Sequence, residues 1–226
     1  MLARMNRLEP SGPVQRFWRA AECGALFLGV PAASAAGWLP VNVILLLLLA
    51  AAGCWLVLNW RYRIRLRDSW HARVPRVEWR RIISIYAVAV LGLGGLLWLA
   101  KPTALFSLLG QNPRKWLLVM FAYPIVSVMP QEVIYRVFFF ERYRALFGRG
   151  AGMVFTSATV FSFGHVVFHN WPAMVLTLAG GLLFAKTYQR TGSLRLVAFE
   201  HALYGGAVFT IGYGEFFFAG TMKLFR

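Results

Sequence analysis

Long apolar runs recur along the chain, and short polar or basic segments separate them. A helix needs about 20 apolar residues to cross a bilayer, because it rises about 1.5 Å per residue and the hydrocarbon core is about 30 Å thick. The pattern therefore predicts an all-α fold, a polytopic transmembrane helix bundle of seven to eight membrane helices. We expect these helices at 17–39, 41–60, 82–100, from 116 to an end within 141–144, and at 152–169, 172–188 and 194–210, with a short aromatic segment at 215–220.

The composition supports a lipid environment. Hydrophobic residues make up 59% of the 226 residues and charged residues only 14%, whereas soluble domains average about 45–50% apolar and about 25% charged residues. The net charge of +16 would suggest nucleic-acid binding in a soluble protein. Here the basic residues lie between the apolar runs, as the positive-inside rule expects, so we predict no nucleic-acid partner. Cys23 and Cys54 both lie in apolar runs and predict neither a disulfide framework nor a metal motif.

The basic segments set the expected orientation. Segment 61–81 is the most basic part of the chain, and further arginines gather at 141–150 and 186–195. Counting membrane crossings places these three segments and the amino terminus on one side, which the charge rule assigns to the cytoplasm. The sequence thus predicts an integral membrane protein with a cytoplasmic amino terminus.

A carboxylate and a guanidinium interrupt the fourth apolar run. Glu132 and Arg136 are four residues apart, so they lie on one face of a helix and can form an ion pair. A charged side chain in the hydrocarbon core costs at least about 2.5–3.5 kcal/mol on insertion scales, so such residues usually face a protein-lined cavity. The spacing alone is compatible with a functional centre and with a structural ion pair that locks two helices.

Two histidines, His165 and His201, lie on later apolar runs at depths within the hydrocarbon core. One carboxylate and two imidazoles on three helices can activate a water molecule and stabilise an oxyanion. The same three side chains, Glu132, His165 and His201, could instead bind zinc and leave one position open for water. His169 lies four residues after His165, but the pair lacks the glutamate of a helical zinc motif.

Three short motifs, in order, resemble those of the CPBP family of intramembrane peptidases, which is related to type II CAAX prenyl proteases and bacteriocin-processing enzymes. The family pattern is Glu-Glu-x-x-x-Arg, then Phe-x-x-x-His, then His-x-x-x-Asn or Asp. This chain has corresponding motifs at 131–136, 161–165 and 201–205. The resemblance covers 116–214 and divides the chain into amino-terminal membrane helices with a basic cytoplasmic loop at 1–115, a peptidase core at 116–214, and a short carboxyl-terminal segment at 215–226.

The resemblance implies an endopeptidase of the bacterial inner membrane that cleaves a membrane-associated peptide or protein and needs no obligatory metal, although zinc remains an alternative. Two positions depart from the pattern. Gln131 replaces the first glutamate, the family's proposed general base, and an amide cannot take a proton. Gly205 replaces the side chain that helps to form the oxyanion hole.

Two hypotheses follow from these departures. In the first, Glu132 is the catalytic base together with His165, while Arg136, Gln131 and His201 complete the catalytic site. In the second, the protein is a catalytically inactive member of the family that acts as a membrane binding, immunity or assembly factor. We favour the enzyme, because Glu132, Arg136, His165 and His201 all occupy their motif positions.

Overall fold

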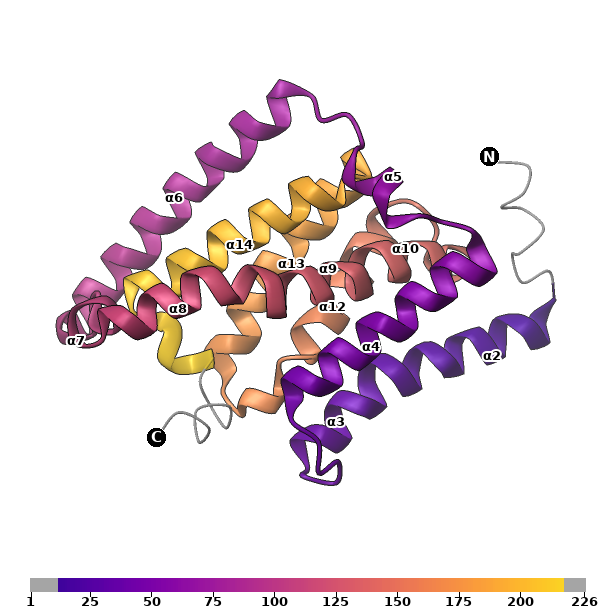
Figure 1. Ribbon diagram of the computed structural model, residues 1–226, viewed down its shortest axis with the longest axis horizontal. Helices are drawn as coiled ribbons and strands as arrows, with labels where there is room; N and C mark the ends of the chain where they lie inside the picture. Colours follow the sequence, from indigo (N-terminus) through magenta and orange to yellow (C-terminus); the bar gives the residue numbers. More distant parts are fainter. Residues whose placement is uncertain (1–11, 218–226) are drawn as a thin grey trace.

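The computed structural model describes residues 12–217, and all regular structure in this range is helical (Figure 1). The predicted all-α fold is therefore confirmed for this part of the chain. Two groups of helices flank a central group: α6 runs along one edge of the molecule, and α2 and α4 run along the other (Figure 1). The helices between them carry the predicted site.

The amino-terminal part begins with a continuous helix formed by α2, Pro13–Gly24, the π-helical η2, Ala25–Gly29, and α3, Val30–Ala35. The next helix is α4, Val43–Val57, extended by the π-helical η3, Leu58–Tyr62. The Asn42 side chain accepts hydrogen bonds from the backbone amides of Ile44 at 2.9 Å and Leu45 at 3.3 Å, and so caps the start of α4. A short helix α5, Leu66–Trp70, leads to the long helix α6, Arg76–Ala100.

The connection after α6 contains η4, Pro102–Ala104, and α7, Ser107–Gln111. A long central helix follows and consists of α8, Pro113–Tyr123, η5, Pro124–Val128, α9, Met129–Glu132, η6, Val133–Phe138, and α10, Phe139–Arg142. Both η5 and η6 are π-helical. We expected Pro130 to kink or divide this helix. Pro130 does not divide it, because the helix is continuous, and Pro130 lies in the short α-helical stretch between the two π-helical segments.

The carboxyl-terminal part contains α11, Arg144–Phe147, α12, Ala151–Phe163, η7, Val166–Phe168, α13, Trp171–Thr191, α14, Leu194–Ile211, and η8, Tyr213–Phe217. The helices α12 and α13 approach each other closely at Gly181. A Cβ added there would lie 3.1 Å from the Cα of Ala158, so glycine permits the close contact. The Asn170 and Ser193 side chains cap α13 and α14.

Within residues 12–217, four helices are long and apolar enough to cross a bilayer: Val43–Tyr62, Arg76–Ala100, Pro113–Arg142 and Ala151–Phe168. The expected spans at 17–39, 172–188 and 194–210 also form helices, but they do not reach that length and hydropathy together. The predicted number of seven to eight spans is therefore not confirmed. A helix such as α14 is less apolar because it carries buried polar side chains, including Glu200 and His201, that face other helices.

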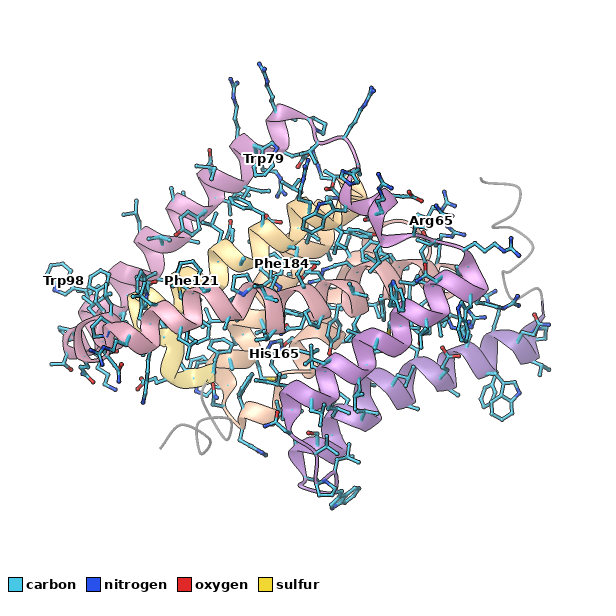
Figure 2. The ribbon with its side chains drawn as sticks, in the orientation of Figure 1. Arg65, Trp79, Trp98, Phe121, His165 and Phe184 are labelled. Atoms are coloured by element: carbon cyan, nitrogen blue, oxygen red, sulfur yellow. The ribbon has the colours of Figure 1, made fainter. Side chains whose placement is uncertain are left out.

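The exposed and buried side chains are divided as expected for a protein in a bilayer. Large apolar side chains are exposed on the outer helices, among them Leu91 and Leu99 of α6, which are 75% and 80% exposed. In contrast, the segment around α9 and η6 is almost entirely buried. Figure 2 shows Phe184 and His165 among the central helices, whereas Trp98 and Arg65 project from the periphery. The molecule is an integral membrane protein whose polar centre lies inside the bundle.

Candidate active site in the bundle interior

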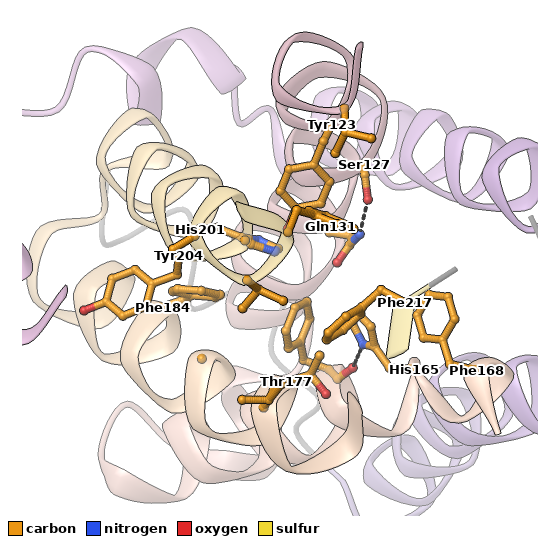
Figure 3. A pocket seen from close by; sticks show the side chains of 18 of the residues that line it. Tyr123, Ser127, Gln131, His165, Phe168, Thr177, Phe184, His201, Tyr204 and Phe217 are labelled. Carbon is orange, nitrogen blue, oxygen red and sulfur yellow. Dashed lines mark hydrogen bonds between the residues drawn. The ribbon is translucent and has the colours of Figure 1, made fainter. Parts of the chain in front are cut away.

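A cavity of about 760 Å³ lies between the central helices and the inner faces of α4 and α6 (Figure 3). Its walls are mostly apolar and aromatic, and a few polar side chains interrupt them. Three of the five predicted site residues line the cavity, namely Gln131, His165 and His201. The other two, Glu132 and Arg136, are 0% exposed and lie behind its wall. Such a concave, largely apolar pocket with a few convergent polar groups is typical of an active or binding site.

Glu132 contacts His201, which lies 69 residues later in the sequence and on another helix. The Oε1 atom of Glu132, on α9, lies 2.7 Å from the Nδ1 atom of His201, on α14. An ionised carboxylate can only accept a hydrogen bond, so the Nδ1 atom of His201 carries the proton. In the neutral ring the Nε2 atom then keeps its lone pair.

Arg136 balances the buried charge of Glu132. Its Nε atom lies 3.3 Å from Oε2 of Glu132, which confirms the predicted ion pair one helical turn apart. The guanidinium also donates to the Oγ atom of Ser157 at 3.0 Å, and its Cζ atom lies 4.9 Å from the centre of the Phe161 ring. These contacts reduce the cost of burying the charge. Both carboxylate oxygens of Glu132 therefore face protein groups rather than the cavity.

His165 has a different environment. We expected it within a helix extending to residue 169, but α12 ends at Phe163, and His165 lies in the turn before η7. Its Nδ1 atom donates to the backbone oxygen of Phe161 at 2.8 Å, so in the neutral ring its Nε2 atom also keeps a lone pair. The Phe161 ring contacts both histidines, with ring centres 4.8 Å from His165 and 5.5 Å from His201.

Gln131 occupies the cavity wall beside this pair. Its Nε2 atom donates to the Oγ atom of Ser127 at 2.7 Å (Figure 3). Its Oε1 atom is buried and has no hydrogen-bond partner among residues 12–217. The structure thus places an amide, which cannot accept a proton at neutral pH, on the cavity side of the neighbouring Glu132.

The described residues do not fit the alternative zinc site. Within 12–217, no three His, Cys, Asp or Glu side chains lie close enough to share a metal ion. The structure brings Glu132 and His201 together, but the Nδ1 atoms of both histidines and both oxygens of Glu132 already contact protein groups. His169 does not form a helical pair with His165, because its backbone is left-handed, with φ of 54°. Whether activity depends on a metal stays a prediction.

The sequence analysis missed Tyr123 and Ser127, which line the cavity on the same helix as Gln131 and Tyr135 (Figure 3). The four residues recur at intervals of four, which is the signal that could have identified them. On a pure α-helix, a step of four residues turns the direction by about 40° away from the starting face. The π-helical segments η5 and η6 hold more residues in each turn and so keep all four side chains on the cavity face.

The fold and the site define a helical membrane protein with a carboxylate–histidine pair at the wall of a cavity between the central helices. The model of one protein family, described as Type II CAAX prenyl endopeptidase Rce1-like, matches residues 113–207. This segment carries all three motifs and all five predicted site residues, and the match confirms the resemblance found in the motifs. No curated protein and no solved structure matches the chain.

Proposed function

We propose that the protein is an intramembrane endopeptidase that hydrolyses a peptide bond of a membrane-associated peptide or protein. The observation that carries this proposal is the 2.7 Å contact between Glu132 and His201 at a cavity that His165 also lines. The match to a family of membrane proteases supports it. The sequence suggested Glu132 itself as the base. Because both Glu132 oxygens face protein groups, we assign the proton transfer to His201 and the support of its charge to Glu132.

In this mechanism the oxygen of a water molecule attacks the carbonyl carbon of the scissile bond. The water gives a proton to Nε2 of His201, and the electron pair of the carbonyl double bond moves to the carbonyl oxygen. The Glu132 carboxylate stabilises the resulting imidazolium. The carbon–nitrogen bond then breaks, the imidazolium proton passes to the leaving amine, and the products are a carboxylic acid and an amine. Nε2 of His165 accepts a hydrogen bond from the attacking water and orients it.

The surroundings of the site suit this chemistry. Aromatic rings cover the pair on several sides, and the ring of Phe184 stacks on His201 with centres 4.6 Å apart. A cavity of about 760 Å³ with mostly apolar walls takes an apolar segment and little bulk water. Electrostatic interactions are stronger in such an environment than in water. The Glu132 carboxylate therefore stabilises the His201 imidazolium more than it would in water.

The test is cleavage by the purified protein in lipid nanodiscs, with a mixture of membrane-anchored peptides and detection of new termini by mass spectrometry. We expect turnover with the natural sequence, and a decrease of about 10² to 10⁴-fold for His201→Ala and for His165→Ala. The matched control is His71→Ala, because His71 is an exposed residue at the end of α5. Equal activity of His201→Ala and His71→Ala would contradict the assignment of the site.

One observation favours the non-catalytic alternative, a membrane factor that binds a peptide without cleaving it. Gln131 faces the cavity at the position of the family's first glutamate, and its amide cannot act as a base. The same peptide mixture distinguishes the two functions. Retention of intact peptides by the natural protein, with no new termini after prolonged incubation, would favour the binding protein.

A further inference from the structure

The hydroxyl group of Tyr123 occupies the space that a side chain at position 205 would need. Gly205 lies on α14 one helical turn after His201. A Cβ atom added at Gly205 would overlap the Tyr123 hydroxyl group. The missing side chain of residue 205 and the position of the Tyr123 phenol are therefore two aspects of one packing arrangement.

The Tyr123 hydroxyl group also has a hydrogen-bond donor that the described part of the chain leaves unused. The side chain lines the cavity (Figure 3), and its hydroxyl makes no hydrogen bond with any other residue in the range 12–217. A Tyr hydroxyl away from bulk water usually has a partner, because leaving it unpaired costs free energy. The neighbouring Ser127 and Gln131 form a hydrogen bond with each other and not with the Tyr123 hydroxyl group.

Tyr123 lies beside the group that takes the proton. Its ring meets the His201 ring edge to face, with centres 6.0 Å apart and planes at 79°. A carbonyl group placed for attack by a water molecule at Nε2 of His201 needs a donor on the side where its oxygen becomes negative. A Tyr hydroxyl is one of the groups that fill this role in proteins.

We infer that Tyr123 is a catalytic residue that donates a hydrogen bond from its hydroxyl group to the carbonyl oxygen of the scissile bond. This inference rests on the proposed peptidase function. When water attacks, its proton moves to His201 and the carbonyl electron pair moves to the oxygen. The Tyr123 O–H stabilises that oxyanion without transferring its own proton. The bond shortens as the negative charge develops, so the stabilisation is larger in the transition state than in the bound substrate.

Two other tyrosines at the cavity are weaker candidates. The Tyr135 hydroxyl group lies against Gly164, where an added Cβ would overlap it, and its ring contacts Phe161 and Phe27 rather than His201. The Tyr204 hydroxyl is buried without a partner among residues 12–217. Tyr204 stacks edge to face on Tyr86 of α6, and Figure 3 shows its hydroxyl pointing away from His165 and Gln131.

The first experiment compares Tyr123→Phe with the natural protein in the nanodisc cleavage assay. We expect kcat to fall by about 10² to 10³-fold, as for the loss of one oxyanion donor, while KM changes by less than about threefold because the ring is retained. The control is Tyr213→Phe. The Tyr213 hydroxyl donates to the backbone of Leu93 at 3.0 Å, and the residue does not line the cavity, so this variant should keep its kcat.

The second experiment moves the donor from one helix to the other. Tyr123→Ala removes the ring and the hydroxyl, and Gly205→Asn alone places a side chain into the space of the phenol, so both single variants should lose activity. In the double variant Tyr123→Ala/Gly205→Asn, the amide group has room and supplies an N–H donor. We expect its kcat to exceed that of Tyr123→Ala by at least about tenfold, a coupling that independent sites do not show.

The outcomes separate this inference from the proposed function. If the natural protein cleaves peptides and Tyr123→Phe keeps its full kcat, the role of Tyr123 is wrong and the proposed function stands. If Tyr135→Phe lowers kcat and Tyr123→Phe does not, Tyr135 is the donor and the inference is again wrong. If the natural protein cleaves nothing, the proposed function and the role of Tyr123 are both overturned.

Discussion

Two carboxylates on neighbouring helices, Glu132 and Glu200, are both 0% exposed. Glu132 lies 2.7 Å from His201 and 3.3 Å from Arg136. Glu200 directly precedes His201 on α14, and its Oε1 atom lies 3.6 Å from Nη2 of Arg81. Adjacent residues on a helix point in different directions, so His201 faces the cavity and Glu200 faces α6. The two carboxylates are equally buried, but Glu132 belongs to the site at the cavity and Glu200 contacts Arg81 of α6.

The surroundings of Glu200 are those of a structural ion network. Arg81 also contacts Glu78 at 3.0 Å and donates to the Thr187 hydroxyl group. Glu78 in turn pairs with Arg190 at 2.7 Å. These contacts join α6 to α13 and α14 and involve no histidine. Burial of a carboxylate beside an arginine therefore does not by itself identify a catalytic centre. The distinguishing feature of Glu132 is its contact with a histidine that lines the cavity.

The largest effect that separates the two carboxylates is expected for Glu132→Gln. The amide oxygen can still accept the hydrogen bond from Nδ1 of His201, but it carries no negative charge to stabilise the imidazolium. We expect kcat to fall by about 10² to 10⁴-fold, because His201 then acts as a general base without the carboxylate that stabilises its protonated form. The measurement is the initial cleavage rate in nanodiscs, with protein that remains monodisperse on size exclusion.

The matched control for this prediction is Glu215→Gln. The Glu215 side chain is 52% exposed and lies 3.4 Å from Lys101, so its neutralisation should leave the cleavage rate unchanged. If Glu132→Gln is as active as this control, the Glu132 carboxylate has only a structural role, as Glu200 does.

The sequence predicted the part of this site that is local. Glu132 and Arg136 are one turn apart on one helix, so their pairing follows from helical geometry, and it is confirmed. The apolar runs likewise predicted helices, because the length and hydropathy of a segment are local properties that can be calculated from the sequence. The contact between Glu132 and His201 joins residues 69 positions apart. It depends on how α9 and α14 pack, which no local pattern contains, although the motif order indicated that the two residues belong to one site.

Other features were missed because they depend on backbone geometry or on absent side chains. The π-helical segment η5 aligns Tyr123, Ser127 and Gln131 on one face more closely than a regular α-helix would, and apolar patterning does not reveal such a segment. The place of the Tyr123 hydroxyl group follows from the absence of a side chain at Gly205. In the sequence, Gly205 was a missing donor. In the structure, it is the space that a donor from another helix occupies.

A moderate effect is expected for Gln131→Glu, which adds a carboxylate on the cavity side of Glu132. The hydroxyl group of Ser127, which now accepts from Gln131 at 2.7 Å, can rotate to donate to the new carboxylate. Two neighbouring carboxylates disfavour each other's charge, so the second one gains little as long as His201 already takes the proton. We expect the cleavage rate to change by less than about tenfold, measured with the same peptides.

This variant also gives the sharpest test between enzyme and binding protein. If the natural protein is inert and Gln131→Glu alone confers cleavage, the natural protein is an inactive family member. The proton would then pass to residue 131, and the role proposed for Glu132 and His201 would be wrong. A rate within tenfold of an active natural protein leaves that role in place.

The smallest effect is expected for Glu200→Gln, the counterpart of Glu132→Gln on α14. Neutralising Glu200 removes a buried charge whose burial is itself costly, and Arg81, which is 22% exposed, keeps its pairing with Glu78. Removal of one partner of a buried ion pair is strongly destabilising when it leaves the other charge uncompensated, and here Arg81 still pairs with Glu78. We therefore expect the cleavage rate to stay within about threefold and the midpoint of thermal unfolding in nanodiscs to shift by only a few degrees, corresponding to about 1 kcal/mol. A loss of activity comparable to that of Glu132→Gln, without a change in unfolding, would show that the proton route continues past His201 to Glu200, so that the two buried carboxylates form one functional unit.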